Sequence, residues 1–235
     1  MDARVTYRVE KSIATITMDD GKVNVLSPEM IAELNHALDL AIADEAVVVL
    51  TSTARTFCAG FDLGELGRGP AAAYALVRSG FELAARLLSF PRPVVIACPG
   101  AAVAMGVFLL LSGDYRVGAA GSYKMTVNEV ALGMTLPSPA IEICRERLAP
   151  AHFNRAIVLG EGFSPGDAVT AGILDRVVPA ADLAAAARAT AAEAAKLDMA
   201  AHAATKLLVR EQLLTRIRAA IASPAGLGLP DDAEG

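Results

Sequence analysis

One uncharged stretch limits the possible folds of this chain more than any other feature. Residues 93–113 contain no Asp, Glu, Lys, Arg or His, and about 20 consecutive apolar residues are enough for a helix that crosses a bilayer. The pair Pro99-Gly100 divides the stretch into a β-branched piece, residues 94–97, and a longer apolar piece, residues 101–111. Each piece is too short to span a membrane, so the stretch predicts a buried strand, a turn and a buried helix.

The composition is typical of one large globular unit. The chain has 235 residues, of which 54% are apolar, enough to enclose a sizeable core. Its formal net charge of −5 gives no basic surface of the kind that binds nucleic acid. The first residues lack the apolar segment of a secretion signal, so we expect a cytoplasmic protein that binds neither membranes nor nucleic acid. Three cysteines without metal-ligand spacing are expected to be reduced thiols in the core: Cys58, Cys98 and Cys144.

Strand and helix periodicities alternate along the chain. Apolar residues alternate over 5–9 and over 14–18, on either side of a turn at Glu10-Lys11, which predicts a hairpin. An N-cap followed by proline, Ser27-Pro28, predicts a helix over 28–43, and the β-branched run 47–51 predicts a strand buried on both faces. The same reasoning predicts strands over 94–97, 115–118 and 173–178, and helices over 71–89, 105–112, 137–148, 151–159 and after Ser164-Pro165. The resulting fold class is α/β.

A composition change near residue 180 divides the chain. Residues 1–180 form the predicted α/β core, and residues 181–235 form a helical C-terminal region. The Gly/Pro/Asp-rich residues 223–235 are expected to be frayed. The basic residues of this region are interpreted as a solvent-facing helix surface: Lys206, Arg210, Arg216 and Arg218.

Several kinds of active site are absent from the sequence. The three histidines, His36, His152 and His202, lie far apart without an i, i+4 partner, so no metal site is expected. The chain contains no G-x-S-x-G motif, no Walker A loop and no G-x-G-x-x-G after a strand. These absences argue against a serine hydrolase of that type, a P-loop NTPase and a dinucleotide-binding enzyme.

Two segments that follow predicted buried strands could instead present backbone amides. In residues 57–63 the small side chains would let the main chain approach a ligand closely. Residues 99–106 lead into the first turn of an apolar helix, where N–H groups lack partners. Together the segments could form an oxyanion hole, with each donor contributing about 3 kcal/mol to a developing enolate. Two ordinary turns are the alternative interpretation of the same spacing.

Segments in a fixed order along the chain carry a family resemblance over about residues 5–215. They are KVNVL at 22–26, RTFCAGFDL at 55–63, residues 93–114, NEVALG at 128–133, and FSPGDA through GILDRVV within 163–178. Together they resemble the enoyl-CoA hydratase/isomerase family, the crotonases. The resemblance implies a spiral of ββα units and a helical C-terminal region that forms a homotrimer or a dimer of trimers.

The resemblance also implies an acyl-CoA site. The thioester oxygen would lie between the backbone N–H groups of Phe61, which follows Ala59-Gly60, and Met105, the middle residue of Ala104-Met105-Gly106. Two of the family's three glycines are replaced in that turn. CoA enters as part of the substrate, so no separate cofactor is expected. The substrate-binding residues implied by the resemblance are Val23, Val25, Ala59, Gly60, Asp62, Leu63, Gly64 and Phe108.

The carboxylates that match the family narrow the reaction. Hydratases of this family use two glutamates on one water; the second matches Glu129, while the first falls on Phe108. A phenylalanine transfers no proton, so one acid/base is available. The resemblance therefore favours isomerisation of 3-enoyl-CoA to 2-enoyl-CoA in fatty-acid metabolism, with burial raising the pKa of Glu129.

Other interpretations stay open at this point. One is hydration of 2-enoyl-CoA by Glu129, alone or with Glu82 or Glu142. Another is a non-catalytic acyl-CoA-binding protein. Without the resemblance, Glu129 would be interpreted as a helix N-cap or a surface charge.

Overall fold

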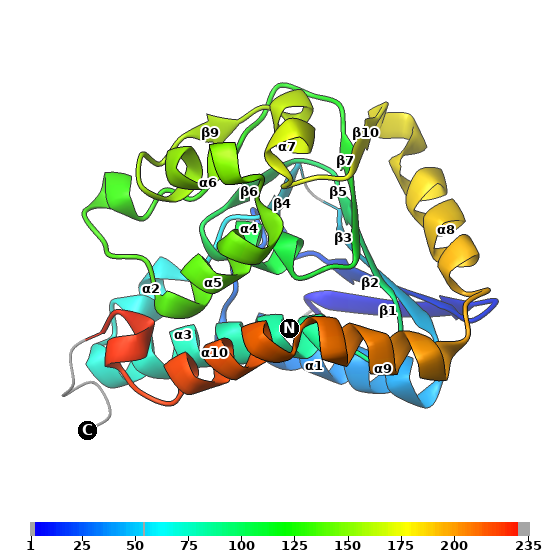
Figure 1. Cartoon of the computed structure of the whole chain (residues 1–235), viewed down its shortest axis with the longest axis horizontal. Helices are drawn as coiled ribbons and strands as arrows, with labels where there is room; N and C mark the ends of the chain where they lie inside the picture. Colours follow the sequence, from blue (N-terminus) through cyan, green and yellow to red (C-terminus); the bar gives the residue numbers. More distant parts are fainter. Residues whose placement is uncertain (1–2, 54, 230–235) are drawn as a thin grey trace.

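The computed structural model describes residues 3–53 and 55–229 and contains two sheets (Figure 1). The large sheet has the strand order β1-β2-β3-β5-β7-β10. Its strands are β1 (Val5–Glu10), β2 (Ile13–Met18), β3 (Val47–Ser52), β5 (Val94–Cys98), β7 (Tyr115–Ala119) and β10 (Arg176–Val178). The small sheet has the order β4-β6-β8-β9, formed by β4 (Thr56–Cys58), β6 (Ala101–Val103), β8 (Met125–Thr126) and β9 (Gly162–Phe163).

Helices connect these strands. The longer ones are α1 (Pro28–Ala43), α3 (Pro70–Leu88), α5 (Ser138–Arg147), α8 (Leu183–Ala194), α9 (Met199–Val209) and α10 (Glu211–Ile221). The shorter ones are α2 (Leu63–Leu66), α4 (Met105–Leu111), α6 (Pro150–Ile157) and α7 (Pro165–Ala171), with 3-10 turns η1 (Val130–Leu132), η2 (Ala180–Asp182) and η3 (Ala225–Leu227). Apart from the first hairpin, the strands of the large sheet pair in parallel, as α/β connections require.

The N-terminal hairpin is confirmed, with its turn one residue later than predicted. The ladder extends to Glu10, which lies opposite Ile13. Lys11 and Ser12 therefore make the turn, with φ of 51° and 59°. Two consecutive left-handed residues match the twist of a two-residue hairpin.

The uncharged stretch forms the predicted strand and helix, but residues 101–103, expected in the apolar piece after the turn, form a second strand, β6. All residues of β5 and α4 are buried, and β6 lies between them. Among the described residues, no helix combines the length and apolarity needed to cross a bilayer.

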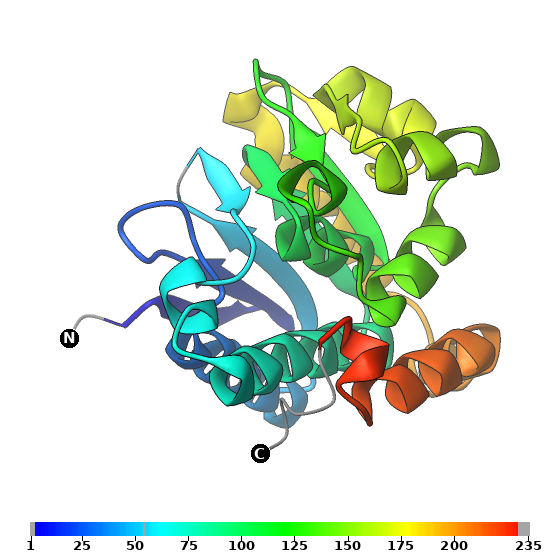
Figure 2. The same cartoon turned by 90° about the vertical axis from the view of Figure 1, so that its left-hand side faces the viewer.

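The large sheet is covered on both faces, as Figure 2 shows from a second direction. Val48 and Leu50 of β3 belong to the main core, together with residues of α1, α3, α4, α5 and α10. Val47 and Val49 point to the opposite face, where α8 covers them. Side chains alternate between faces along a strand, so an unbroken apolar run fits a strand buried on both sides, and this prediction is confirmed.

Two predictions about the later chain are wrong. Residues 223–229 were expected to be frayed, but Leu227 is only 2% exposed and packs into the main core; residues 230–235 lie outside the described part. The predicted strand over 173–178 begins only at Arg176. Gly172 ends α7 with φ of 82°, and the N–H groups of the two following residues bond to Ala168 O, which holds them out of the ladder. The domain division at residue 180 stays a prediction.

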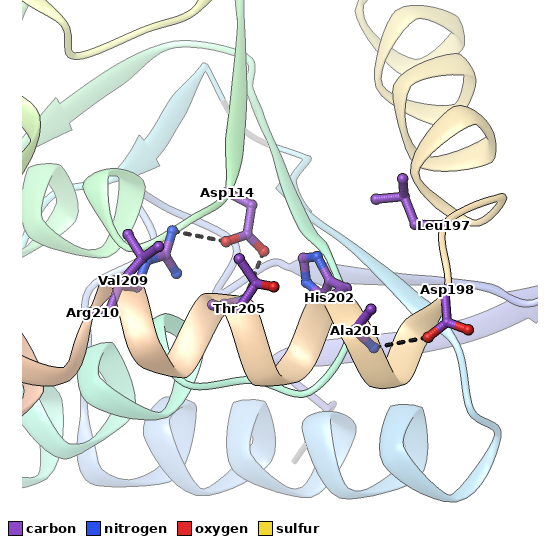
Figure 3. Close-up of a pocket in the computed structure, with 9 residues that line it drawn as sticks. Asp114, Leu197, Asp198, Ala201, His202, Thr205, Val209 and Arg210 are labelled. Atoms are coloured by element: carbon purple, nitrogen blue, oxygen red, sulfur yellow. Dashed lines mark hydrogen bonds and ion pairs between the residues drawn. The ribbon is translucent and has the colours of Figure 1, made fainter.

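The basic residues of the C-terminal helices divide into two kinds. Arg216 and Arg218 are exposed, as predicted, but Lys206 and Arg210 are buried. Both reach Asp114, the residue before β7: Lys206 Nζ lies 2.7 Å from Oδ2 and Arg210 Nη2 lies 2.8 Å from Oδ1. Figure 3 shows this contact beside a cavity of about 420 Å³ along α9. The half-buried carboxylate of Asp114 therefore holds these two cations inward, and the solvent-facing interpretation is wrong for them.

Candidate active site

Two loops that leave the small sheet meet at Gly60. The parallel pairing of β4 and β6 places Cys58 beside Ala102, so the segments that follow these strands run side by side. Gly60 has φ of 94°, and a Cβ atom placed on it would lie 3.2 Å from Ala104 Cβ and 3.7 Å from the backbone nitrogen of Met105. Only a glycine allows the two loops to approach this closely.

This meeting point presents two unpaired amides. Leu26 bridges to Phe61 in parallel: Leu26 N donates to Gly60 O at 2.8 Å, and Asp62 N donates to Leu26 O at 3.1 Å. In such a pair the N–H of Phe61 itself points away from Leu26. Met105 is the first residue of α4, so its N–H has no partner within the helix. Within the described residues neither amide has an acceptor, and the two donors lie in adjacent loops, as an oxyanion hole requires.

The turn that carries Met105 is strained. Ala104 has φ of 50° and ψ of −121°, a conformation that favours glycine. Its N–H donates to Thr126 O at 2.9 Å, and its carbonyl accepts from Val107 N at 2.8 Å. These hydrogen bonds hold the alanine in a backbone conformation that costs about 1–3 kcal/mol.

Replacing Ala104 with glycine is expected to stabilise the protein by about 1 kcal/mol, because the relieved strain exceeds the added chain entropy. The melting temperature would rise by roughly 2–4 °C in thermal unfolding. Ala189→Gly, on an exposed position of α8, is the matched control and should lower it. A fall of the same size in Ala104→Gly would show that the turn is not strained at this residue.

Glu129 is a buried carboxylate in the segment after β8, and Thr126 of that strand accepts a hydrogen bond from Ala104 N, next to Met105. Glu129 lies directly before η1, is 7% exposed, and its Oε2 has no hydrogen-bond partner. Its side chain makes no cap hydrogen bond, so the N-cap and surface-charge interpretations are wrong. Burial raises the pKa of the Glu129 carboxyl, as predicted, and no neighbouring charge contributes to the shift.

The other carboxylates considered in the sequence are already paired. Glu82 is exposed on α3 and lies 2.9 Å from Arg78 Nε. Glu142 contacts Arg145 and lies 3.0 Å from Arg216 Nη1. The partial burial of Glu142 is outweighed by these guanidinium groups, which hold the pKa of its carboxyl below the usual range. Neither carboxylate is free to serve as a second acid/base.

Phe108 belongs to an aromatic row in the core. It is 1% exposed and stacks on Phe81 with ring centroids 6.0 Å apart. Phe81 in turn meets Phe61 edge to face at 6.4 Å. The row connects α4 through α3 to the loop that presents the Phe61 amide.

The residues matched to CoA binding lie along the same loops. Ala59 N donates to Val23 O at 3.1 Å, so the segment around Val23 and Val25 runs beside the Ala59–Phe61 segment. Leu63 is 74% exposed, and Gly64 N donates to Asp62 Oδ1, which makes Asp62 the N-cap of α2. The predicted substrate-binding residues therefore lie in neighbouring segments along these loops, except for Phe108, which is buried in the core.

Sequence reasoning missed the residues that shape these loops. Asn24 is fully buried with φ of 57°, and its Nδ2 donates to Thr56 O at 3.0 Å. The carboxylate of Asp20 accepts N–H groups from Lys22, Asn24 and Val25. An Asp four residues before an Asn that tolerates left-handed backbone was the available signal.

Comparisons with known proteins agree with this architecture. The model of the enoyl-CoA hydratase/isomerase family matches residues 8–224. Mouse mitochondrial enoyl-CoA delta isomerase 1 is 34% identical over 172 residues, which is 71% of this chain and 60% of the mouse protein. An enoyl-CoA hydratase/isomerase family protein of Pseudomonas syringae has a TM-score of 0.92 and 45% identity, covering 93% of this chain and 95% of that one.

A third relative comes from Mycobacterium tuberculosis, with a TM-score of 0.91 and 46% identity over 94% of this chain and 97% of the other. One structure names it an enoyl-CoA isomerase, and another names the same protein a probable enoyl-CoA hydratase. The chain belongs to the enoyl-CoA hydratase/isomerase family and has its crotonase fold.

Proposed function

We propose that this protein converts a 3-enoyl-CoA into the 2-enoyl-CoA, with Glu129 as the single acid/base. The observation that carries the proposal is one buried carboxylate, that of Glu129, with an unpartnered Oε2. The first of the two glutamates that the family's hydratases use falls on Phe108 in this chain. Two of the relatives carry the name isomerase, which supports the same reaction.

The reaction moves one proton and one double bond. The ionised Glu129 removes a proton from C2, and the electron pair passes into the thioester carbonyl to give a dienolate. The N–H groups of Phe61 and Met105 donate to its oxygen and stabilise the negative charge. Glu129 returns the proton at C4, which leaves the double bond between C2 and C3. A carboxyl with a raised pKa suits this task because it must hold the proton between the two transfers.

Hydration is the second candidate, and the arrangement of carboxylates argues against it. Adding water across a 2-enoyl-CoA requires groups that hold the water and transfer its protons. Phe108 can do neither, and the carboxylates of Glu82 and Glu142 are paired with arginines.

Two substrates offered separately test the proposal. With a 3-enoyl-CoA, we expect formation of the conjugated 2-enoyl-CoA, followed by its ultraviolet absorbance and by chromatography. With a 2-enoyl-CoA, we expect no 3-hydroxyacyl-CoA. Water addition without isomerisation would overturn the proposal, and binding of both thioesters without turnover would favour the acyl-CoA-binding interpretation.

The remaining expectations accompany this proposal. Both proton transfers are made by Glu129, so the reaction needs no cofactor beyond the CoA of the substrate. A place in fatty-acid β-oxidation and assembly as a homotrimer or a dimer of trimers are proposed on the family resemblance, and a cytoplasmic location stays a prediction from the sequence.

A further inference from the structure

The backbone conformation at Gly80 does not require a glycine. This residue lies inside the 19-residue helix α3, and it is not among the glycines with positive φ. A glycine inside a helix costs about 1 kcal/mol relative to alanine. The space around its Cα explains the residue better than its conformation does.

The side chains of both proposed amide donors end at this glycine. A Cβ atom placed on Gly80 would lie 2.4 Å from Cε1 and 2.6 Å from Cζ of Phe61, and 3.7 Å from Cε of Met105. The first two distances are well below van der Waals contact, so the Phe61 ring occupies the space that a side chain at position 80 would need.

We propose that Gly80 is a positioning residue for the oxyanion hole. By lacking a side chain, it seats the Phe61 ring against α3 and so fixes the peptide that carries the Phe61 N–H next to the N–H of Met105. The inference rests on the proposed function and adds a residue on a different helix to that site.

The ring has little room to move elsewhere. Its edge-to-face neighbour Phe81 is fully buried and is itself stacked on Phe108, so the ring cannot move deeper into the core. A methyl group at position 80 therefore pushes the ring toward the open side of the site.

The backbone of Phe61 can follow such a push. The peptide that carries the Phe61 N–H also carries Gly60 O, which accepts from Leu26 N at 2.8 Å, so a push on the ring tilts this peptide against that hydrogen bond. Gly60 has no side chain, and its φ of 94° lies in a region open to glycine, so the backbone before the peptide can adjust. Rotation about Gly60 reorients the peptide N–H of Phe61. A misplacement of about 1 Å at a catalytic group can cost about 100-fold in rate.

The substitution Gly80→Ala tests the inference. We expect kcat for the isomerisation to fall about 10- to 100-fold, with KM changed less than about threefold, because the thioester oxygen is stabilised most in the transition state. Alanine favours the helix, which offsets part of the cost of displacing the ring, so the melting temperature should change by only a few degrees. If Gly80 served only to pack the helix, its replacement would not lower kcat while leaving KM and the melting temperature almost unchanged.

A second substitution separates the ring from the amide. Phe61→Leu keeps the N–H donor and removes the ring atoms that face Gly80, so Gly80→Ala should cost less than about threefold in kcat when introduced into Phe61→Leu. This non-additivity is the expected signature of two groups in contact. Gly166→Ala, a helical position with no atom within 4 Å of the added Cβ, is the control and should leave kcat unchanged.

The inference would be overturned if Gly80→Ala lowered kcat by the same factor in the original protein and in Phe61→Leu. A folded Gly80→Ala protein with kcat within twofold of the original would overturn it as well, and so would a large fall in melting temperature that accounts for the lost activity. If the original chain itself failed to isomerise a 3-enoyl-CoA, the proposed function would fall and this inference with it. If the original chain isomerises the substrate and Gly80→Ala does so at the same rate, the proposed function stands and only the role of Gly80 is overturned.

Discussion

Replacing Glu129 with glutamine is expected to lower kcat for the isomerisation by about 10²- to 10⁴-fold, the range for loss of a general acid/base. Glutamine keeps the size and shape of the side chain but cannot take a proton from C2. Because Oε2 of Glu129 has no partner in the protein, the substitution breaks no hydrogen bond of that atom, and the loss should appear in kcat rather than in folding.

Stability provides the internal check on this result. Burial raises the pKa of Glu129, which means that the ionised carboxylate is disfavoured in the folded protein relative to the unfolded chain. The resulting destabilisation is present above the folded-state pKa and disappears at lower pH, where the carboxyl is protonated in both states. A neutral glutamine removes this cost, so the melting temperature at neutral pH should be unchanged or higher.

Glu82→Gln is the control for the activity measurement. Its carboxylate is exposed and paired with Arg78, and we expect its kcat to stay within twofold of the original. Comparable activity in Glu129→Gln and Glu82→Gln would remove Glu129 from the mechanism.

Replacing Asp114 with asparagine is expected to destabilise the protein by about 3–5 kcal/mol, because breaking a buried ion pair leaves charges without compensation. Its carboxylate accepts hydrogen bonds from Lys206 Nζ and from Val94 N, both at 2.7 Å, and pairs with Arg210 at 2.8 Å. Burial lowers the pKa of Lys206 to about 8 even with Asp114 present. The melting temperature should therefore fall by roughly 10 °C.

Two further variants identify the cause of that loss. Glu193→Gln removes a carboxylate from an exposed pair with Lys196, whose side chain is 69% exposed, and should cost less than about 1 kcal/mol. Adding Lys206→Met to Asp114→Asn removes one stranded cation and should recover part of the stability. Equal melting temperatures for Asp114→Asn and Glu193→Gln would contradict the proposed burial of the charge cluster.

Most elements were predictable because their signals are local. The Ser27-Pro28 cap, the alternation of the first hairpin and the Pro99-Gly100 break each act within a few residues of the structure they specify. The two errors in the later chain have different causes. The strand after Gly172 is shortened by a local turn, in which the next two residues bond back to Ala168 O. Leu227 is held by a contact between distant parts of the chain, its packing in the main core.

Patterns in the sequence predicted the strands of the large sheet, the main helices and the burial of the uncharged stretch, and the family resemblance located the segments that hold Phe61, Met105 and Glu129. The short strands of the small sheet were not predicted, and the way these segments act together depends on tertiary contacts. Contact at Gly60 brings the two amide loops side by side, and burial leaves a Glu129 oxygen without a partner. Lys206 likewise turns inward to Asp114, 92 positions earlier in the chain. The physical reason is the same in each case: propensity and periodicity describe neighbours along the chain, whereas burial, charge pairing and close backbone approach depend on residues that meet only in the folded protein.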